Sequence, residues 1–292
     1  MKLRFPLSIL ISVFAIVLSG CASPPGDSGT ITVNDGRDAL AAPMTVYYYR
    51  PDTFKPDGPV LIALHGLSRN AYGYRNYFAK SAHKYGVLVL APEFTRKNFR
   101  GSRRFNLGNL KDKSGATQPK SLWAFPVIDR VFEKSRAMLG FERQKYALFG
   151  HSAGSQFVHR MILFSPSEKM SAAVAANAGW YTVPDKRIAF PYGLKGTDSA
   201  TKKLRDAFGQ KLTILLGTDD NDESHKTLRK TEGALQQGSH RLARGRNFYQ
   251  RSMEIAAQKK LSFRWQIREV PGVAHSGRGM AEPAANILFG TP

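Results

Sequence analysis

Short apolar runs alternate with longer stretches of helical spacing along most of the chain. Runs with strand character fall at residues 44–50, 60–64, 87–92, 145–149, 172–177, 212–216 and 261–270. Apolar positions repeat as on one face of a helix at residues 72–84, 122–139, 155–164 and 247–260, and a short helix closes the chain. Several strand runs are apolar throughout, which is typical of strands covered on both faces. The pattern predicts one α/β domain, a mostly parallel sheet with helices on both sides.

Residues 1–20 follow a different pattern. Lys2 and Arg4 precede an apolar run at 7–18, and two small residues follow it. A basic start, a short apolar run and a small-residue end are typical of a secretory signal peptide. The apolar run of about a dozen residues is too short to span a bilayer comfortably. We therefore expect residues 1–20 to be removed on export.

The next residue, Cys21, is the single cysteine of the chain. The stretch Leu18-Ser19-Gly20-Cys21 resembles a bacterial lipobox, in which cleavage before the cysteine is followed by its lipidation. Ala22 is not the aspartate that usually marks inner-membrane retention in enterobacterial lipoproteins. The resemblance therefore implies a lipid anchor in the outer membrane, facing the periplasm or the exterior. The alternative is a plain signal peptide with an incidental thiol.

Composition divides the rest of the chain into a tether and a domain. Residues 21–43 are rich in Ser, Pro, Gly, Asp and Ala and are expected to form a tether and the domain edge, with the catalytic domain at 44–292. The net charge is +21, and +19 without residues 1–20, which carry two basic residues and no acidic one. Such an excess attracts anionic membranes, polysaccharides or nucleic acid. No nucleic-acid-binding motif is present, so we expect the anionic envelope as neighbour and no nucleic-acid partner.

The candidate chemistry centres on the run Gly150-His151-Ser152-Ala153-Gly154. It stands between a predicted strand and a predicted helix, which is the context of a nucleophile elbow, a tight turn that lifts a serine above the carboxyl edge of a parallel sheet. A strained turn leaves no room for side chains two positions to either side of the serine, which accounts for both glycines. Because a bare Gly-x-Ser-x-Gly also arises by chance, the assignment depends on partners for Ser152 elsewhere in the chain.

A serine hydroxyl needs a base to become a nucleophile, and the base needs an orienting acid. Of the seven histidines, only His275 follows a strand late in the chain, in a glycine-flanked loop that can reach back over the sheet edge. The loop after the strand at 212–216 offers Asp219, Asp220 and Asp222 as the acid. The order serine, aspartate, histidine is that of α/β-hydrolases, and all three positions follow strands at their carboxyl ends.

Several motifs together resemble a secreted α/β-hydrolase of the esterase and polyhydroxyalkanoate-depolymerase-like group. The matching stretches cover most of residues 44–290 and comprise His65-Gly66, the elbow at 150–157, Asn177-Ala178-Gly179-Trp180-Tyr181, Gly217-Thr218-Asp219-Asp220 and Gly272-Val273-Ala274-His275. The Gly-x-x-Asp spacing of the family falls on Asp220, with Asp219 and Asp222 as alternatives.

The resemblance also implies an oxyanion hole. One donor is the backbone N–H of Ala153, the residue after the nucleophile, and the other comes from the loop of the His-Gly motif. We expect that second donor to be the N–H of Leu67, with Ser68 as the alternative. His65 is then a structural residue that holds the loop.

These assignments imply an enzyme of the serine esterase type that cleaves carboxylic esters through an acyl-enzyme. His275 takes the proton of Ser152, and Asp220 orients the imidazole. No cofactor and no metal is implied, and the expected partners are a small-molecule or polymeric ester and the membrane that holds the lipid anchor. A peptidase or acyltransferase with the same three residues is an alternative, as is a non-catalytic envelope-binding lipoprotein.

Two further groups are candidates for substrate binding. Trp123, Trp180 and Tyr181 are expected near the carboxyl edge of the sheet and could form an acyl or aromatic subsite, core packing being the alternative. The basic stretch 96–105, with Phe99 and Phe105 interleaved, is expected on the same rim. It could steer anionic or polysaccharide-linked esters, or it could be a solvated loop.

Overall fold

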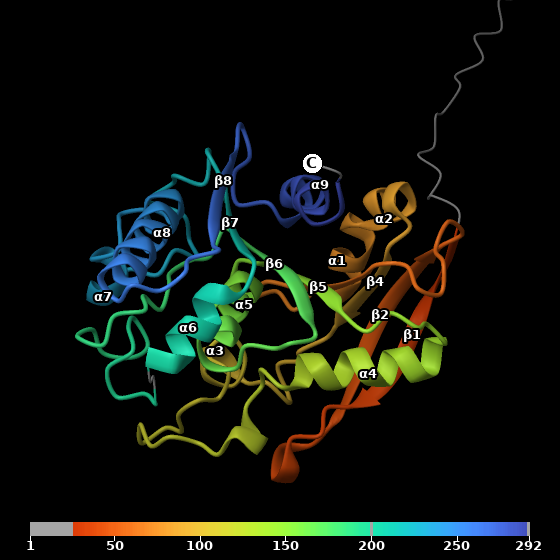
Figure 1. The fold of residues 1–292 in the computed structure, drawn as a ribbon, viewed down its shortest axis with the longest axis horizontal. Helices are drawn as coiled ribbons and strands as arrows, with labels where there is room; N and C mark the ends of the chain where they lie inside the picture. The colour runs from red at the N-terminus through yellow and green to blue at the C-terminus, as the bar shows by residue number, and fades with distance from the viewer. Residues whose placement is uncertain (1–25, 199–200, 291–292) are drawn as a thin grey trace, which may run out of the picture.

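The computed structural model describes residues 26–198 and 201–290, and within them one eight-stranded sheet runs through the centre of the molecule (Figure 1). Its strand order is β1-β2-β4-β3-β5-β6-β7-β8. The strands are β1 (Gly26–Asn34), β2 (Pro43–Pro51), β3 (Val60–Leu64), β4 (Leu88–Pro92), β5 (Tyr146–His151), β6 (Met170–Ala176), β7 (Leu212–Gly217) and β8 (Gln266–Val270).

The sheet is parallel from β4 to β8 and antiparallel at one edge. Strand β2 pairs antiparallel with β1 and with β4, and every other pairing is parallel. The predicted mostly parallel sheet is thus confirmed. All the carboxyl ends of β3 to β8 meet at one edge of the sheet, which is where the candidate residues lie.

Alternate residues of the central strands pack on opposite faces of the sheet, as the two-residue period of a strand requires. Ile62 and Leu64 of β3 belong to the larger core cluster, whereas Leu61 and Ala63 belong to the smaller one. Because both faces are covered, these strands are apolar throughout, and all five residues of β3 are buried.

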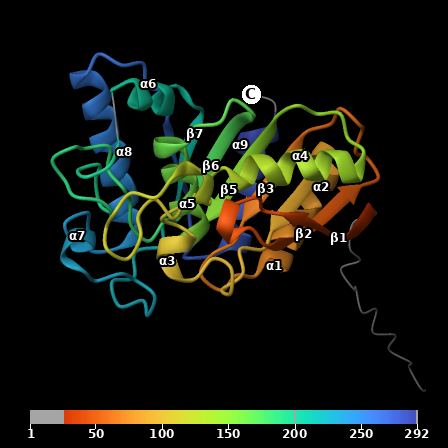
Figure 2. The same cartoon turned by 90° about the horizontal axis from the view of Figure 1, so that it is seen from below.

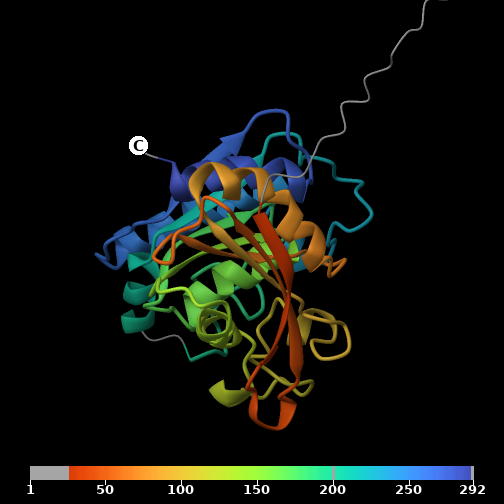
Figure 3. The ribbon, with the colours of Figure 1, turned by 90° about the vertical axis from the view of Figure 1, so that its right-hand side faces the viewer.

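Two layers of helices cover the sheet (Figures 1 and 3). The smaller core lies under α1 (Ala71–Tyr77), α2 (Ala79–Tyr85) and α9 (Gly277–Phe289). The larger core lies under α4 (Val127–Leu139), α5 (Ala153–Phe164), α6 (Thr201–Gly209) and α8 (Arg241–Gln258). In the view from below, α4 and α5 cross the front of the strands and α9 lies behind them (Figure 2). The short helices are α3 (Gly101–Arg104) and α7 (Glu232–Leu235), with single 3-10 turns at Asp38–Leu40 and Lys120–Leu122.

The structure corrects several predicted boundaries. The sheet begins at Gly26, because β1 lies within the segment expected as tether and domain edge. The stretch expected as one helix at 72–84 is two helices separated at Phe78. Helix α4 begins only after Pro126, so 122–126 is not α-helical, and the last strand is half as long as expected. Helix α6 lies in a segment for which the sequence pattern predicted no helix.

No helix within residues 26–198 and 201–290 has the length and apolar character needed to cross a bilayer. The expected signal peptide at 1–20 and the expected lipidation site Cys21 lie outside the described residues.

Candidate active site

Ser152 occupies the sharp turn between β5 and α5. Its backbone has φ 57° and ψ −112°, a conformation that a residue with a side chain rarely adopts. Such strain persists only where the surroundings impose it, and here the Ser152 N–H donates to the carbonyl oxygen of Ala176 on β6 at 3.0 Å. The elbow predicted from the sequence is therefore present.

Close packing of backbone explains both glycines of the motif. A Cβ atom on Gly150 would lie 2.3 Å from the carbonyl oxygen of Gly154, and one on Gly154 would lie 2.5 Å from the carbonyl oxygen of Leu64. Both distances are shorter than any tolerated contact with backbone. The requirement for glycine two positions before and after Ser152 is confirmed.

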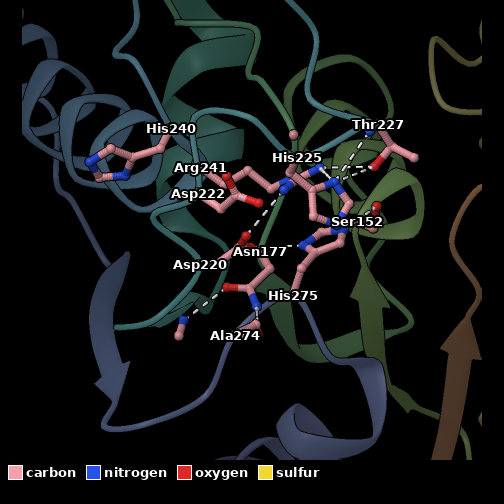
Figure 4. Close-up of polar contacts among 12 residues, drawn as sticks. Ser152, Asn177, Asp220, Asp222, His225, Thr227, His240, Arg241, Ala274 and His275 are labelled. Atoms are coloured by element: carbon pink, nitrogen blue, oxygen red, sulfur yellow. Dashed lines mark hydrogen bonds and ion pairs between the residues drawn. The ribbon is translucent and has the colours of Figure 1, made fainter.

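The three candidate catalytic side chains meet at the carboxyl edge of the sheet (Figure 4). The Nε2 atom of His275 lies 3.0 Å from Oγ of Ser152, and its Nδ1 atom lies 2.8 Å from Oδ2 of Asp220. Asp220 is buried, and His275 is partly buried, so the chain of hydrogen bonds is shielded from water on the acid's side. A hydroxyl, an imidazole and a carboxylate in this order form the arrangement in which the imidazole can take the serine proton.

The structure also separates the three candidate acids. Only Asp220 contacts His275; its N–H closes a turn onto the carbonyl of Gly217 at the end of β7. Asp219 accepts a hydrogen bond from the Thr218 hydroxyl. Asp222 is exposed and accepts bonds from Ser224 in a local turn. The Gly-x-x-Asp spacing thus selected the aspartate that reaches the histidine.

Asn177, which follows β6 directly, connects the loop that carries Asp220 to the loop that carries His275 by hydrogen bonds. Its side-chain oxygen accepts the N–H of Gly217 at 2.9 Å, and its side-chain nitrogen donates to the carbonyl of Ala274 at 3.2 Å (Figure 4). Its φ of 48° lies in the left-handed region, which asparagine tolerates better than most residues. Sequence reasoning gave Asn177 no separate role, although a polar residue at the carboxyl end of a buried strand was the available signal.

The two expected oxyanion donors border Ser152. Ala153 is the first residue of α5, and its N–H has no carbonyl partner within the helix. The Gly66 carbonyl accepts the N–H of Arg69 at 3.2 Å. Because a trans peptide directs its carbonyl and its N–H to opposite sides, the Leu67 N–H faces away from that contact. A Cβ on Gly66 would lie 3.5 Å from Cβ of Ser152, so this loop covers the serine.

Two solved structures resemble the chain over nearly its whole length. Poly(aspartic acid) hydrolase-1 from Sphingomonas sp. KT-1 shares 38% identity over 92% of this chain and 100% of that one, with a TM-score of 0.84. LpqC, a poly(3-hydroxybutyrate) depolymerase from Bordetella parapertussis, shares 35% identity over 90% of each chain, also with a TM-score of 0.84. The chain belongs to the α/β-hydrolases. It is an enzyme of the hydrolase class, in the family that these two proteins represent.

More distant structures share the fold alone. An S-formylglutathione hydrolase from Agrobacterium tumefaciens is 17% identical over 93% of this chain and 96% of that one, with a TM-score of 0.55. No family model and no curated protein matches the sequence.

The histidine of the His-Gly motif in this hydrolase is structural. His65 is fully buried; its Nε2 accepts the N–H of Phe94 at 3.0 Å, which leaves the proton on Nδ1, 3.0 Å from the Gly66 carbonyl. Burial lowers the pKa of His65 to about 4, so the ring is neutral at physiological pH. Its role is to hold the loop that carries Leu67, as expected.

His151, within the elbow, packs under the candidate base of the hydrolase. Its ring centroid lies 4.7 Å from that of His275, and its Nδ1 is 2.8 Å from the hydroxyl of Tyr74. A Cβ atom on Gly66 would lie 3.6 Å from the same hydroxyl, so Tyr74 lies between the oxyanion loop and the elbow. Burial lowers the pKa of His151 strongly, with the nearby His275 as a second cause. It is not bonded to the Ser152 hydroxyl.

Arg241 at the start of α8 completes the environment of the acid, and sequence reasoning missed it. Its guanidinium, which is 2% exposed, lies 3.2 Å from Oδ1 of Asp220, the oxygen that does not face His275. It also donates to Thr227 at 2.9 Å and lies 3.2 Å from Nδ1 of His225 (Figure 4). Nothing in the local sequence marks an arginine in a polar region as a partner of a buried carboxylate.

The structure does not bring all three aromatic candidates to the serine. Trp123 lines a cavity together with Phe164, the last residue of α5. At 1.5 Å per residue, Phe164 lies about 16 Å along the helix from Ala153, the residue that follows Ser152. Tyr181 is fully buried and stacks on Phe248 with ring centroids 4.5 Å apart, so it belongs to the core. Trp180 is also buried, between the guanidinium groups of Arg160 and Arg229 at 4.1 and 4.8 Å.

The basic stretch 96–105 divides into core and surface. Phe99 and Phe105 are buried, and Phe105 packs under the guanidinium of Arg69 at 3.9 Å. Arg96 donates to the carbonyl of Leu67 at 2.9 Å, so one cation of the stretch touches the oxyanion loop. Among the described residues, no group of three His, Cys, Asp or Glu side chains is placed to hold a metal ion.

Proposed function

We propose that this hydrolase cleaves carboxylic esters through an acyl-enzyme formed on Ser152, at the bacterial cell envelope. The observation that carries the proposal is the continuous hydrogen-bonded chain from Ser152 through His275 to Asp220, with contacts of 3.0 and 2.8 Å. Membership of a family that includes esterases and a depolymerase supports the same chemistry.

In the proposed reaction, His275 accepts the proton of Ser152 while Oγ attacks the acyl carbonyl carbon. The negative oxygen that forms accepts hydrogen bonds from the N–H groups of Ala153 and Leu67. His275 then returns its proton to the leaving alcohol, and the carbon–oxygen bond breaks. A water molecule, deprotonated by the same imidazole, attacks the carbonyl carbon of the acyl-enzyme. His275 then returns the proton to Oγ of Ser152, the bond between Oγ and the acyl carbon breaks, and the acid is released. Asp220 holds the imidazole in the tautomer that these transfers require.

A fluorophosphonate probe and a set of p-nitrophenyl esters test this mechanism. Ser152→Ala should lose both labelling and turnover. Ser155→Ala, a matched control at a buried serine whose hydroxyl has no bonding partner within the described residues, should keep both. Labelling or turnover above a few per cent in Ser152→Ala would refute the assignment, and a wild-type chain that takes no label would favour a non-catalytic envelope protein.

The envelope location is supported by the sequence alone. A run of basic, apolar and small residues ends at Cys21, and the net charge of +19 that remains without residues 1–20 suits an anionic membrane surface. We propose that the cysteine carries a lipid anchor in the outer membrane. Incorporation of an alkyne-labelled fatty acid in the wild type, lost in Cys21→Ala, is the expected result. Equal incorporation in both would contradict the anchor.

A second candidate reaction is hydrolysis of an acidic polymer. The 38% identical relative is named for hydrolysing poly(aspartic acid), a polymer of carboxylates joined by amide bonds. In this chain the exposed Arg96 and the partly exposed Arg229 lie beside the loops of the site, and neither of them forms an ion pair with any described acidic residue. The same three catalytic residues would act on an amide carbonyl.

Salt dependence distinguishes an acidic polymer from a neutral polyester. Turnover of poly(aspartic acid) should fall steeply with ionic strength, and turnover of poly(3-hydroxybutyrate) should not, because screening acts on charged partners only. Neutralising Arg100, Arg103 and Arg104 to Gln should flatten that dependence. The control variant neutralises three cations that precede strands at the opposite edge of the sheet, Lys145, Lys211 and Arg264. It should leave the salt dependence unchanged. An unchanged salt dependence in the variant of Arg100, Arg103 and Arg104 would rule out steering by the basic stretch 96–105.

A further inference from the structure

A second imidazole stands beside the candidate base and has no role in the proposed reaction. The ring of His225 lies 5.5 Å from the ring of His275, nearly perpendicular to it at 70° (Figure 4). His225 belongs to the loop between β7 and α7, and it is partly exposed.

Its hydrogen bonds fix which nitrogen carries the proton. The Nδ1 atom accepts the backbone N–H of Thr227 at 3.2 Å, and Nη2 of Arg241 lies 3.2 Å from the same atom. Two N–H donors facing Nδ1 require a lone pair there, so the single proton of the neutral ring is on Nε2. Burial lowers the pKa of His225, with Arg241 and His275 as further causes, and the ring is therefore neutral near pH 7. The Nε2–H makes no hydrogen bond with any described residue.

The position of His225 beside His275 suits contact with the leaving group of the substrate. In the reaction proposed above, His275 delivers its proton to the leaving oxygen, so the leaving group must pass beside His275. A donor at the edge of that ring can reach an acceptor a few bonds along the leaving group. His151, the other imidazole against His275, cannot do so because it is buried beneath the ring.

We propose that His225 is a specificity-determining residue, whose Nε2–H binds a carbonyl or carboxylate oxygen carried by the leaving group. The favoured substrates are then oligomers or polymers, in which the leaving unit is itself an acid derivative, rather than esters of simple alcohols. This inference rests on the proposed function, since it assigns a binding role beside the same nucleophile.

Two esters with the same acyl group test the inference. The butanoyl ester of methyl 3-hydroxybutanoate has a carbonyl oxygen on its leaving group, and the butanoyl ester of 2-hexanol has none. The measured quantity is the ratio of their kcat/KM values, which cancels any loss common to both. Because the two share one acyl-enzyme, deacylation does not enter the ratio.

In His225→Leu, which removes the donor, the ratio should fall about tenfold, and in His225→Gln, which places an N–H near the position of Nε2, it should stay within threefold of wild type. A ratio unchanged in His225→Leu, whatever the loss in absolute rate, would overturn the inference, because a residue that only supports Arg241 would slow both esters alike. An equal fall in both variants would also overturn it. A wild-type chain that neither hydrolyses the two esters nor takes a fluorophosphonate label would instead refute the proposed function, and this inference with it.

Discussion

Acid should destabilise this protein steeply between pH 6 and 5, because three histidines are buried as neutral rings. His65, His151 and His159 are each at most 4% exposed. His65 and His159 each accept a backbone N–H on Nε2, from Phe94 and Thr182, so protonation would break a hydrogen bond as well as bury a charge. Burial lowers the pKa of all three below the ordinary value, to about 4 for His65.

The direction of the pH dependence of stability follows from proton binding in the folded and unfolded states. The unfolded chain binds protons on these histidines below about pH 6.5, and the folded chain does not until the pH approaches the lowered pKa values. Their contribution to stability is therefore complete above pH 6.5 and is lost as the pH falls toward the lowered pKa values, which for His65 is about 4. Each neutral buried histidine contributes a slope of about 1.4 kcal/mol per pH unit, so three give about 4 kcal/mol per unit. That is a large part of the roughly 5–15 kcal/mol by which domains are stable.

Carboxylates do not interfere in this window. Hydrogen bonds from Arg187 are the main cause that lowers the pKa of Asp185 to about 2, so its stabilisation is lost only below the ordinary value of an aspartate. Other carboxylates with lowered pKa values, such as Glu133, likewise act below about pH 4.5. Between pH 6 and 5 the slope reports histidines.

Urea unfolding followed by tryptophan fluorescence at pH 7, 6, 5.5 and 5 measures the slope directly. His159→Gln removes one titrating ring, so it should lower stability at pH 7 but reduce the slope between pH 6 and 5 by about 1.4 kcal/mol per unit. A wild-type slope below about 1.4 kcal/mol per unit, or the same slope in His159→Gln, would refute the reasoning.

Four further predictions concern the site. Arg241→Met leaves a buried carboxylate without its cation and should destabilise the fold by about 3–5 kcal/mol in urea unfolding, whereas a loss below 1 kcal/mol would mean that the buried pair is not needed. Asp220→Asn should lower kcat about 10⁴-fold, and Asp219→Asn, the matched control, less than threefold; similar losses in both would contradict the choice of acid. Gly154→Ala puts a methyl group 2.5 Å from a carbonyl oxygen, so it should lower the free energy of unfolding by about 1–3 kcal/mol and abolish most of the activity. A variant that is active and as stable as wild type would disprove the close packing. Tyr74→Phe removes the hydroxyl between the oxyanion loop and the elbow, and should lower kcat with little change in KM; a rise in KM alone would point to substrate binding instead.

The sequence predicted the central sheet well because buried strands carry a strong signal. Residues 60–64 are apolar throughout, and no amphipathic helix has that pattern. The edge strand β1 was missed because Gly, Ser and Asp at its start dominate the composition, although Thr30-Ile31-Thr32-Val33 alternates as an edge strand does. The break at Phe78 was not predictable from spacing, since both short helices keep their apolar faces on one side of the sheet.

The candidate site was predictable where backbone geometry demands particular residues. A serine at φ 57° needs glycines around it, and a loop after a strand must supply the histidine, so Ser152 and His275 left marks in the sequence. Arg241 left none, because its contact with Asp220 depends on how α8 packs, and α8 begins six residues before the predicted helix. Trp123 and Tyr181 were placed on the rim because aromatic side chains suit a subsite, yet the same side chains also fill cores.

In this fold the catalytic residues are positioned by strand ends, whereas the side chains that would select the substrate come from a segment without a periodic pattern. Strand ends position the nucleophile, the base and the acid, and hydrogen bonds from the Asn177 side chain to backbone groups fix the loops that carry the acid and the base. The side chains beside them, such as His225 and Arg229, come from the segment between β7 and α8, which has one short helix and no periodic pattern. A segment without periodicity can change its side chains without changing the sheet, because none of the strand pairing depends on it. Chains with the same three catalytic residues can therefore differ in the substrates they accept, and in this one the residues that would decide the substrate are cations and an imidazole with a fixed proton.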